Sequence, residues 1–284
     1  MKKISDFLKM IKIEHSVFAL PFAFTGAVIA ARGLPSFSKI FWIAVAMVGA
    51  RTGAMGLNRV IDAEIDKRNP RTASREIPAG KISKTEAVLY IFISFLVYEF
   101  ATFMLNTLCF YLSFIPLTIF ILYSYTKRFT ALCHIVLGVA LGLAPIGAWV
   151  AVRGDIDFGI IIMGLGVLFW VSGFDIIYAL QDVEFDKKEG LFSIPRFLGV
   201  KKSLILAKGF HLLSFVLFLL SALPLNLGKF YIFGIILAGV FMFFQHRLVS
   251  DKDLSRVDVA FFNLNAYISL GVFVFTVLDV FIRG

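Results

Sequence analysis

Long apolar runs separated by short charged segments recur along the whole chain, and this pattern most limits how the chain can fold. Each run is close to the roughly 20 residues that a helix needs to cross a bilayer. The runs lie at residues 14–31, 40–62, 85–105, 107–124, 130–151, 158–181, 203–222, 229–248 and 259–281. Because they are too long for strands and lack alternation, and because lipid offers backbone groups no partners, we expect about nine packed transmembrane helices.

The composition supports the same class of protein. Apolar residues make up 59% of the 284 residues and charged residues 17%, whereas soluble chains have about 45–50% and 25%. The 33 Phe residues exceed what a water-facing surface could hide. This excludes an ordinary soluble enzyme, a disordered chain and a fibrous protein. We predict an all-α polytopic membrane protein with one domain over residues 1–284, in which Cys109 and Cys133 are buried thiols.

Lys and Arg are distributed unevenly between alternate connecting segments. With the N-terminus inside, the inner segments carry 21 of the 28 basic residues and the outer segments carry 5. Cytoplasmic loops carry the excess of Lys and Arg, so this bias predicts a cytoplasmic N-terminus and an outer C-terminus. The expected location is the cell inner (cytoplasmic) membrane, with the lipid bilayer as surroundings. Because the basic residues are spread over loops, no nucleic-acid partner is expected.

Two acidic arrays lie where an apolar run meets an inner loop. The first array consists of Asn58, Asp62 and Asp66, and the second of Asp175, Tyr178, Asp182 and Asp186. Steps of three and four residues put each set on one helix face. Arg51 is two turns deeper on the first stripe. The equal spacing of the carboxylate pairs in the two arrays suggests two related halves.

The arrays predict a site for a metal ion and a phosphate. Carboxylates four residues apart repel each other in a helix, and ionisable residues at a membrane boundary are costly, so both arrays are functional candidates. Mg²⁺ prefers oxygen ligands and is commonly shared between carboxylates and a phosphate substrate. Basic residues nearby supply phosphate donors, namely Arg71, Arg75, Lys127 and Arg128. Together they describe a diphosphate clamp at the inner end, open to a lipid-tailed substrate.

Two other classes of protein remain as alternatives. A transporter also uses intramembrane charges, but those would favour mid-span positions, whereas the acidic arrays lie at the inner span ends. A metal-binding structural or assembly subunit would not need Arg71 and Arg75 beside its acidic residues. Release of diphosphate from a prenyl donor in the presence of Mg²⁺ and an aromatic acid would distinguish an enzyme from both.

Three segments resemble the signature motifs of a known family. They are the first array followed by Arg71-Thr-Ala-Ser-Arg75-Glu-Ile-Pro78, the segment Tyr123-Ser-Tyr-Thr-Lys127, and the second array beginning Asp175-Ile-Ile-Tyr178-Ala. In this order they resemble the motifs of the UbiA-type intramembrane aromatic prenyltransferases, and the number of spans matches as well. The resemblance covers nearly the whole chain.

The resemblance implies a Mg²⁺-dependent transfer of a polyprenyl group from polyprenyl diphosphate to the ring of an aromatic acid. The implied metal ligands are Asn58, Asp62, Asp66, Asp182 and Asp186. The implied substrate-binding residues are Arg51, Asn58, Arg71, Arg75, Tyr123, Lys127, Arg128, Tyr178 and Ser193. Within these sets Arg51 would bind the aromatic carboxylate. Asp175 would contact the phenol or take its proton, and Asp62, Asp66, Asp182 and Asp186 complete the catalytic set.

The acceptor stays open between two aromatic acids. The form of the second array is similar to the 4-hydroxybenzoate polyprenyltransferases of ubiquinone biosynthesis. Gly190-Leu-Phe-Ser193, however, stands where many of those enzymes have Gly-Ile-Lys-Ser, so Phe192 replaces a basic residue. This variant resembles members tied to the futalosine-type menaquinone route, whose acceptor would be a dihydroxynaphthoate. Prenyl chain length and oligomeric state also stay open.

Overall fold

The structure of the chain is a computed structural model that describes residues 2–11 and 19–283. In that part of the chain the regular secondary structure is entirely helical. The helices are α1 (Lys2–Met10), α2 (Leu20–Ala31), α3 (Phe37–Ile61), α4 (Ala63–Arg68), α5 (Lys84–Leu105), α6 (Thr107–Thr126), α7 (Cys133–Arg153), α8 (Phe158–Ala179), the 3-10 helix η2 (Leu180–Asp182), α9 (Val183–Glu189), α10 (Ile194–Ser221), α11 (Lys229–Leu248) and α12 (Val257–Arg283). The prediction of an all-α membrane protein is confirmed.

Within the described residues, eight helices are long and apolar enough to cross a membrane. They are α3, α5, α6, α7, α8 with its continuation to Glu189, α10, α11 and α12. Each coincides with one of the predicted runs. The remaining run, predicted at 14–31, corresponds to the 12-residue apolar helix α2. Residues 14–18 of that run lie outside the described residues.

Large apolar side chains cover the outside of the molecule, the reverse of a water-soluble protein. Along α5 the side chains of Phe92, Leu96, Phe100 and Phe103 are all more than half exposed. Such a surface needs an apolar solvent, since soluble monomers rarely expose large contiguous apolar patches. The exposed face of the bundle therefore faces lipid.

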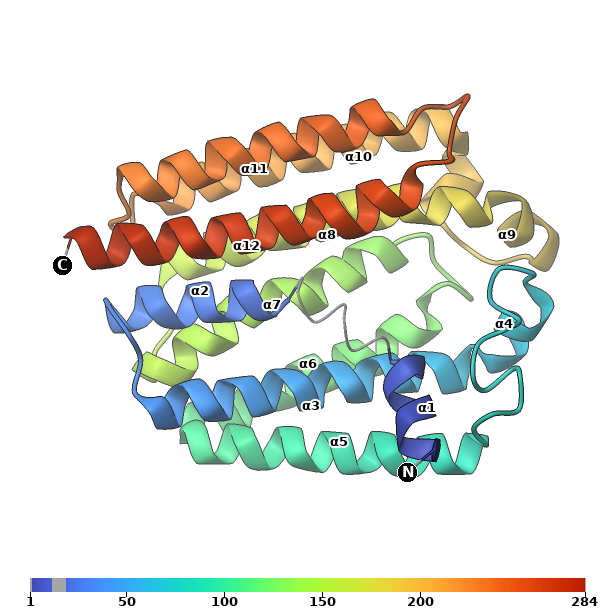
Figure 1. Cartoon of the computed structure of the whole chain (residues 1–284), viewed down its shortest axis with the longest axis horizontal. Coiled ribbons are helices and arrows are strands. Elements are labelled where there is room, and N and C mark those ends of the chain that lie inside the picture. Colours follow the sequence, from blue (N-terminus) through green and yellow to red (C-terminus); the bar gives the residue numbers. More distant parts are fainter. Residues whose placement is uncertain (1, 12–18, 284) are drawn as a thin grey trace.

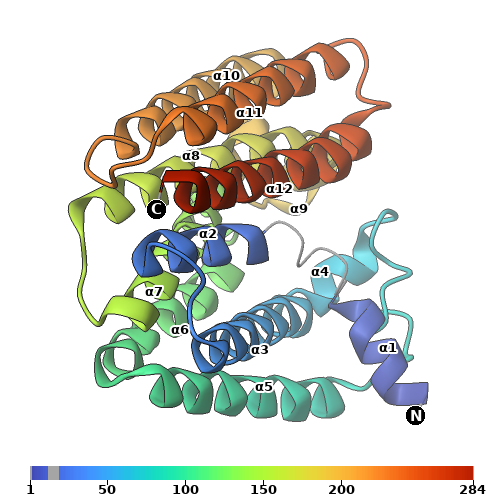
Figure 2. The ribbon, with the colours of Figure 1, turned by 60° about the vertical axis from the view of Figure 1, so that its left-hand side comes forward.

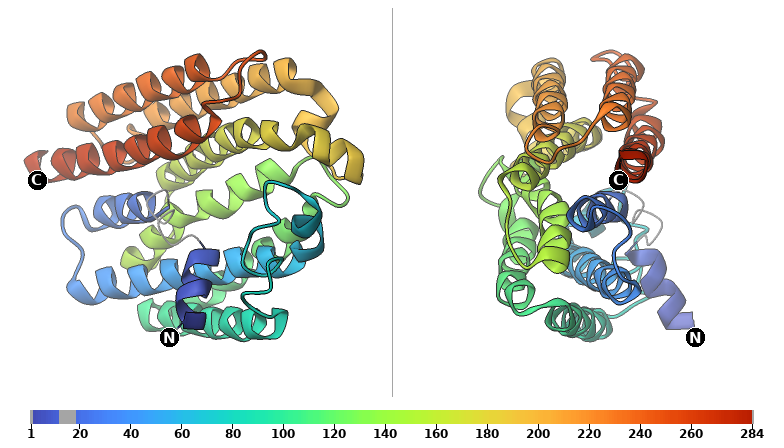
Figure 3. Two further views of the ribbon diagram at one scale, coloured as in Figure 1. Left: turned by 45° about the vertical axis from the view of Figure 1, so that its right-hand side comes forward. Right: turned by 90° about the vertical axis from the view of Figure 1, so that its left-hand side faces the viewer.

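The long helices run roughly side by side in one bundle (Figure 1). Helices α8, α10, α11 and α12 form one side of it, α3, α5 and α6 the other, and α2 and α7 lie between them (Figure 2). The short helices α4 and α9 lie together at one end of the bundle, and the C-terminus lies at the opposite end (Figures 1 and 3). Both acidic arrays therefore meet at the same end, as the sequence predicts.

Close packing of α7 on α8 depends on glycine. A Cβ added at Gly138 would lie 2.4 Å from the Leu168 carbonyl oxygen, and one added at Gly142 would lie 2.6 Å from the Gly164 carbonyl oxygen. Only glycine allows the two backbones to approach this closely, which is how small residues bring membrane helices together. Helix α2 uses the same device, because a Cβ at Gly26 would overlap the backbone of α7.

Helix α1 packs across the end of the bundle that carries α4. Its apolar residues Phe7 and Met10 join a buried cluster with residues of α4, α5 and the loop between them. The Phe7 ring lies 4.7 Å from the ring of Tyr90 on α5. The carbonyl oxygen of Met10 accepts a hydrogen bond of 3.4 Å from the Arg59 guanidinium. The amphipathic N-terminal segment is thus held against α3, beside the acidic end.

Candidate active site

One cavity of about 610 Å³ collects nearly all of the predicted site residues. Its lining includes residues from both acidic arrays and from the loops that follow them. These lining residues are Arg51, Asn58, Asp62, Asp66, Arg71, Arg75, Tyr123, Lys127, Asp175, Tyr178, Asp182, Asp186 and Ser193. Arg128 is the one predicted site residue absent from this lining, and it lies behind Asp62 instead. Its contact with substrate stays a prediction.

Asp62 lies at the junction of α3 and α4 and is 2% exposed. Lys127 and Arg128, at the end of α6, form ion pairs with its two carboxylate oxygens at 2.6 and 3.0 Å. Asn58, one turn earlier, donates to it at 3.0 Å. Two cations from another helix thus compensate a carboxylate that burial would otherwise make costly.

Asp66 is one turn further along, on α4, and is 4% exposed. The backbone hydrogen bond from Asp66 N–H to the Asp62 carbonyl, 2.8 Å long, continues the helical stripe past the end of α3. Arg75 reaches back from the loop and donates to both carboxylate oxygens of Asp66 at 2.7 Å. The Arg loop predicted to bind phosphate therefore folds over the first acidic array.

Asp182 ends the 3-10 helix that follows α8. Arg71 donates to both of its carboxylate oxygens, one of them at 2.9 Å, and Asn69 donates to it at 3.0 Å. Partial burial lowers the pKa of Arg71, but the hydrogen bond and charge of Asp182 outweigh this and raise that pKa above its ordinary value. Arg71 is therefore charged at every accessible pH, and it links the second array to the loop of the first.

Tyr178 and Ser193 complete this end of the cavity. The Tyr178 hydroxyl accepts a hydrogen bond of 3.1 Å from Arg71, whose guanidinium also lies over the tyrosine ring at 5.3 Å. Ser193 caps the start of α10 and donates to Asp186 at 2.6 Å. The Phe192 N–H donates to the Lys127 carbonyl at 2.7 Å, so the loop after α9 is attached to the end of α6.

The candidate metal ligands fit a metal ion held jointly by the protein and a substrate phosphate better than one held by protein side chains alone. Among the described residues, no group of three or more His, Cys, Asp and Glu side chains converges on one point. The carboxylates of Asp62, Asp66, Asp182 and Asp186 instead line one cavity. Each accepts from a cationic or hydroxyl partner, and phosphate oxygens could replace the carboxylate as the acceptor of that partner's hydrogen bonds. Mg²⁺ normally binds through one or two carboxylates, waters and substrate phosphates, so this arrangement suits a metal that is bound together with a diphosphate.

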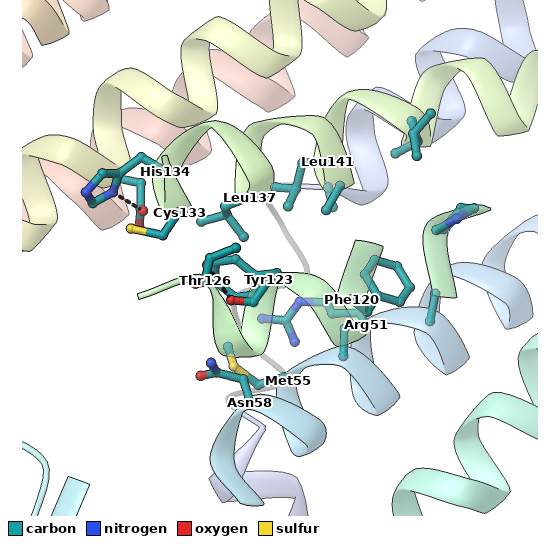
Figure 4. Close-up of a pocket in the computed structure, with 18 of the residues that line it drawn as sticks. Arg51, Met55, Asn58, Phe120, Tyr123, Thr126, Cys133, His134, Leu137 and Leu141 are labelled. Carbon is teal, nitrogen blue, oxygen red and sulfur yellow. Dashed lines mark hydrogen bonds and ion pairs between the residues drawn. The ribbon is translucent and has the colours of Figure 1, made fainter. Parts of the chain in front are cut away.

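Deeper in the cavity, the lining combines a few polar groups with apolar walls (Figure 4). Arg51, on α3, donates to the Ile11 carbonyl at 3.2 Å, two turns below Asn58. Tyr123 of α6 lines the same region, and in the view of Figure 4 its ring lies between Arg51 and His134. Beyond them the wall becomes apolar, with Leu112, Pro116 and Leu141 among the lining residues. A long apolar chain can follow this path.

Three residues of the site were not assigned from the sequence. His134, a histidine within an apolar run, forms a 2.6 Å hydrogen bond with Asp175. Asn69 holds Asp182, and Arg59 lines the cavity although it is only 7% exposed. An Arg within an apolar run was a usable signal for Arg59. Nothing in the sequence shows that α7 and α8 are in register at His134 and Asp175.

Paired acidic and basic side chains that line a cavity at one end of an all-α membrane bundle are the kind of site expected of a membrane enzyme. A family model described as "UbiA prenyltransferase family" matches residues 19–267. Because this match spans most of the chain, the chain belongs to the UbiA prenyltransferase family and is a prenyltransferase.

Several relatives carry more specific names. The chain is 28% identical over 261 residues to a 4-hydroxybenzoate octaprenyltransferase of Francisella tularensis subsp. tularensis, covering 91% of this chain and 89% of that one. It is 27% identical over 259 residues to a protein of the same name from Photobacterium profundum, covering 90% and 88%. These matches extend over nearly the full length of each chain.

Solved structures share the fold. The apo structure of a UbiA homologue from Aeropyrum pernix K1 superposes with a TM-score of 0.83 at 32% identity, covering 95% of this chain and 98% of that one. A UbiA homologue from Archaeoglobus fulgidus, bound to GPP and Mg²⁺, superposes with a TM-score of 0.70 at 20% identity, covering 94% and 99%. At that identity the second likeness supports the fold alone.

Proposed function

We propose that this prenyltransferase moves a polyprenyl group from polyprenyl diphosphate to the ring of an aromatic acid, 4-hydroxybenzoate, in respiratory quinone biosynthesis. The observation that carries the proposal is one cavity whose acidic and basic end continues into an apolar channel. A diphosphate matches the first part and a polyprenyl chain the second. The names of the relatives from Francisella and Photobacterium support the choice of acceptor.

The acidic end would hold the donor through Mg²⁺. The ligands we propose are Asn58, Asp62, Asp66, Asp182 and Asp186, all of which line the cavity. The Archaeoglobus homologue, which shares the fold, is itself bound to GPP and Mg²⁺, and we extend that metal and class of donor to this chain as part of the proposal. When bound, Mg²⁺ supplies positive charge to the diphosphate oxygens and so makes the diphosphate a better leaving group.

The basic residues of the clamp stabilise the charge that develops as the allylic C–O bond breaks. Arg71, Arg75 and Lys127 now bind carboxylates, and each can turn its N–H groups to the diphosphate oxygens once a metal takes the carboxylates. Fixed donors of this kind act where the charge forms and so lower the barrier. The apolar walls below the clamp would limit the access of water, which could otherwise capture the allylic cation.

The acceptor would lie deeper, between Arg51 and Asp175. The Arg51 guanidinium suits the aromatic carboxylate, because it makes charge-assisted and bidentate contacts. Asp175 faces the hydroxyl at the other end of the ring. The allylic carbon then bonds to the ring carbon next to the hydroxyl, and loss of the ring proton restores aromaticity.

One observation favours a dihydroxynaphthoate as the alternative acceptor. Phe192, which stands where many 4-hydroxybenzoate enzymes have a basic residue, lines the cavity. Its ring carries the Arg196 guanidinium at 5.2 Å, so that cation lies against the ring. An added aromatic wall favours a larger, two-ring acceptor.

The deciding experiment offers both acceptors in competition to the purified protein with a polyprenyl diphosphate and Mg²⁺. Mass spectrometry of the products would identify the acceptor, and diphosphate release would follow the same reaction. We expect transfer that depends on Mg²⁺ and is stopped by a chelator. If the protein releases diphosphate but prenylates neither acid, the proposed acceptor class is wrong.

We further propose that residues 1–284 act as a single domain in the cell inner membrane. The N-terminus and the end that carries α4 and α9 would face the cytoplasm. The bias of Lys and Arg toward the segments at that end supports this orientation.

A further inference from the structure

We propose that His134 positions Asp175 to receive the hydroxyl proton of the aromatic acceptor, so that the two residues work as a pair. This inference rests on the proposed function. It assigns a role in the reaction to a histidine outside the acidic arrays and their Arg loops.

The pair joins two helices across the cavity wall. Nδ1 of His134, in the first turn of α7, lies 2.6 Å from Oδ2 of Asp175 near the end of α8. Both residues line the cavity. The His134 side chain is 3% exposed, whereas that of Asp175 is 17% exposed. Of the two, the carboxylate is therefore the group that can reach a substrate, and the imidazole lies behind it.

The backbone around the pair is fixed. The Ser172 hydroxyl, on α8, donates to the His134 carbonyl at 3.2 Å. One turn further along α7, Gly138 lies so close to α8 that an added Cβ would come within 2.4 Å of the Ser172 hydroxyl. This close approach determines the register of the two helices. The position of His134 opposite Asp175 is thus a consequence of how α7 and α8 pack.

The surroundings of the imidazole assign its proton. Nε2 of His134 is buried and has no hydrogen-bond partner among the described residues. If the only proton were on Nε2, the lone pair of Nδ1 would face an oxygen of the Asp175 carboxylate at 2.6 Å, and two acceptors at that distance repel each other. The proton therefore lies on Nδ1 and is donated to Asp175. This bond engages Oδ2, so Oδ1 is the oxygen that accepts from the substrate.

The pair accounts for the protons of the reaction. Asp175 takes the hydroxyl proton as the ring carbon forms its bond to the allylic carbon and the C–O bond to diphosphate breaks. The ring is then a ketone with one ring proton in excess. That proton leaves with the diphosphate, and Asp175 returns its own proton to the oxygen. His134 keeps Nδ1–H throughout, so its role is to orient the carboxylate.

The test compares His134→Leu with His134→Asn. Asparagine can place an N–H donor near the position of Nδ1, whereas leucine cannot. With geranyl diphosphate, Mg²⁺ and 4-hydroxybenzoate, we expect His134→Leu to lower kcat by about 10- to 100-fold, as the loss of an orienting partner typically does. His134→Asn should restore much of the rate. The donor KM and the slow hydrolysis of geranyl diphosphate without acceptor should change by less than about twofold.

An acceptor with a more acidic phenol distinguishes a positioning role of His134 from a role in packing alone. The loss caused by His134→Leu should shrink with 3-fluoro-4-hydroxybenzoate, whose phenol gives up its proton more readily. The double variant His134→Leu/Asp175→Asn should be no slower than Asp175→Asn alone, since residues that act together are not additive. Equal losses for both acceptors and for hydrolysis, or fully additive losses, would overturn the proposal.

His211→Leu provides the matched control. His211 is also a buried histidine, but it pairs with His246 on α11 at 3.0 Å and does not line the cavity. The ratio of its rates with 4-hydroxybenzoate and 3-fluoro-4-hydroxybenzoate should equal the ratio for the unchanged protein. If the unchanged protein prenylates no aromatic acid, the proposed function fails. If it is active and His134→Leu is equally active, only the inference about His134 fails.

Discussion

At the scale of single residues, the site is organised by pairing acids with cations from distant parts of the chain. Asp62 pairs with the end of α6, Asp66 with the loop after α4, and Asp182 with the same loop. Each carboxylate lies where an isolated charge would be costly. Removing one partner therefore disturbs both substrate binding and the balance of charge.

Asp62→Ala and Asp182→Ala should each lower kcat/KM by at least about 10²-fold, because neither array alone can hold a metal diphosphate. Glu184→Ala is a suitable control, since Glu184 is 86% exposed and pairs only locally, with Lys187. Diphosphate release by the purified variants measures the effect, and circular dichroism in detergent checks that each is folded. Near-normal activity of either aspartate variant would contradict the metal assignment.

Arg51→Met and Arg71→Met should affect different substrates. Arg51 lies about 10 Å along the helix from Asn58, at 1.5 Å per residue, which is too deep for direct contact with the diphosphate. Loss of a charge-assisted contact costs roughly 1.5–3 kcal/mol, or about 10- to 150-fold. We expect Arg51→Met to raise the acceptor KM by this factor, and Arg71→Met to raise the donor KM by this factor. Steady-state kinetics with each substrate varied would reveal a reversed pattern if the division is wrong.

Sequence reasoning found the residues of the clamp but not all of their partners. The spacing of Asp62 and Asp66 is a local property of one helix, and it was predictable. The contact of His134 with Asp175 depends on the register of two helices, which no local pattern specifies. Arg128 donates to the Ile61 carbonyl at 2.9 Å and pairs with Asp62, two partners that its position in the sequence does not indicate, and its contact with substrate stays a prediction.

At the scale of elements, hydropathy located the helices well and their ends less well. The run at 158–181 was predicted as one helix, but the chain tightens into a 3-10 turn at Leu180–Asp182 before α9 begins. The run at 203–222 is longer in the structure, because α10 begins at Ile194 and bends at Gly199, where φ is +73°. Polar helical turns beyond the apolar core carry no hydropathy signal, although Asp182 and Asp186 lie on them.

Gly138→Ala should destabilise the bundle by forcing α7 away from α8. The added Cβ would meet the Leu168 carbonyl at 2.4 Å, a backbone group that cannot move aside. Overpacking of this kind costs about 1–3 kcal/mol. Gly209→Ala, on α10, is the control, since nothing lies within 4 Å of its Cβ position. Melting temperatures in detergent compare the two, and an unchanged Gly138→Ala protein would contradict the close α7–α8 contact.

At the scale of the whole molecule, the position of the clamp at one end of the bundle bears on the routes by which the proposed substrates would enter. The clamp lies at the end that carries α4 and α9, and the C-terminus lies at the other end (Figure 1). A donor with a long apolar tail can stay in the bilayer while its diphosphate reaches the clamp. The water-soluble acceptor would approach from the side of the membrane that this end faces.

Cysteine labelling tests this orientation. In a Cys109→Ser/Cys133→Ser background, Lys81→Cys and Lys188→Cys should resist a membrane-impermeant maleimide on intact cells and react after lysis. Leu223→Cys, in the connection between α10 and α11 at the opposite end, should react in intact cells, because Leu223 is 88% exposed. Labelling of Lys81→Cys or Lys188→Cys from outside would reverse the predicted topology.

The pairing of acids with cations also determines the order in which the site fills. In the structure Asp62, Asp66 and Asp182 already have positive partners, so a bare metal ion that binds them must displace a lysine or an arginine and leave it without a counter-ion. A diphosphate that arrives with its metal exchanges partners on both sides at once, carboxylates passing to the metal and guanidinium groups to the phosphates. Metal and donor should therefore bind as one unit, and the clamp should return to its paired state when the diphosphate leaves.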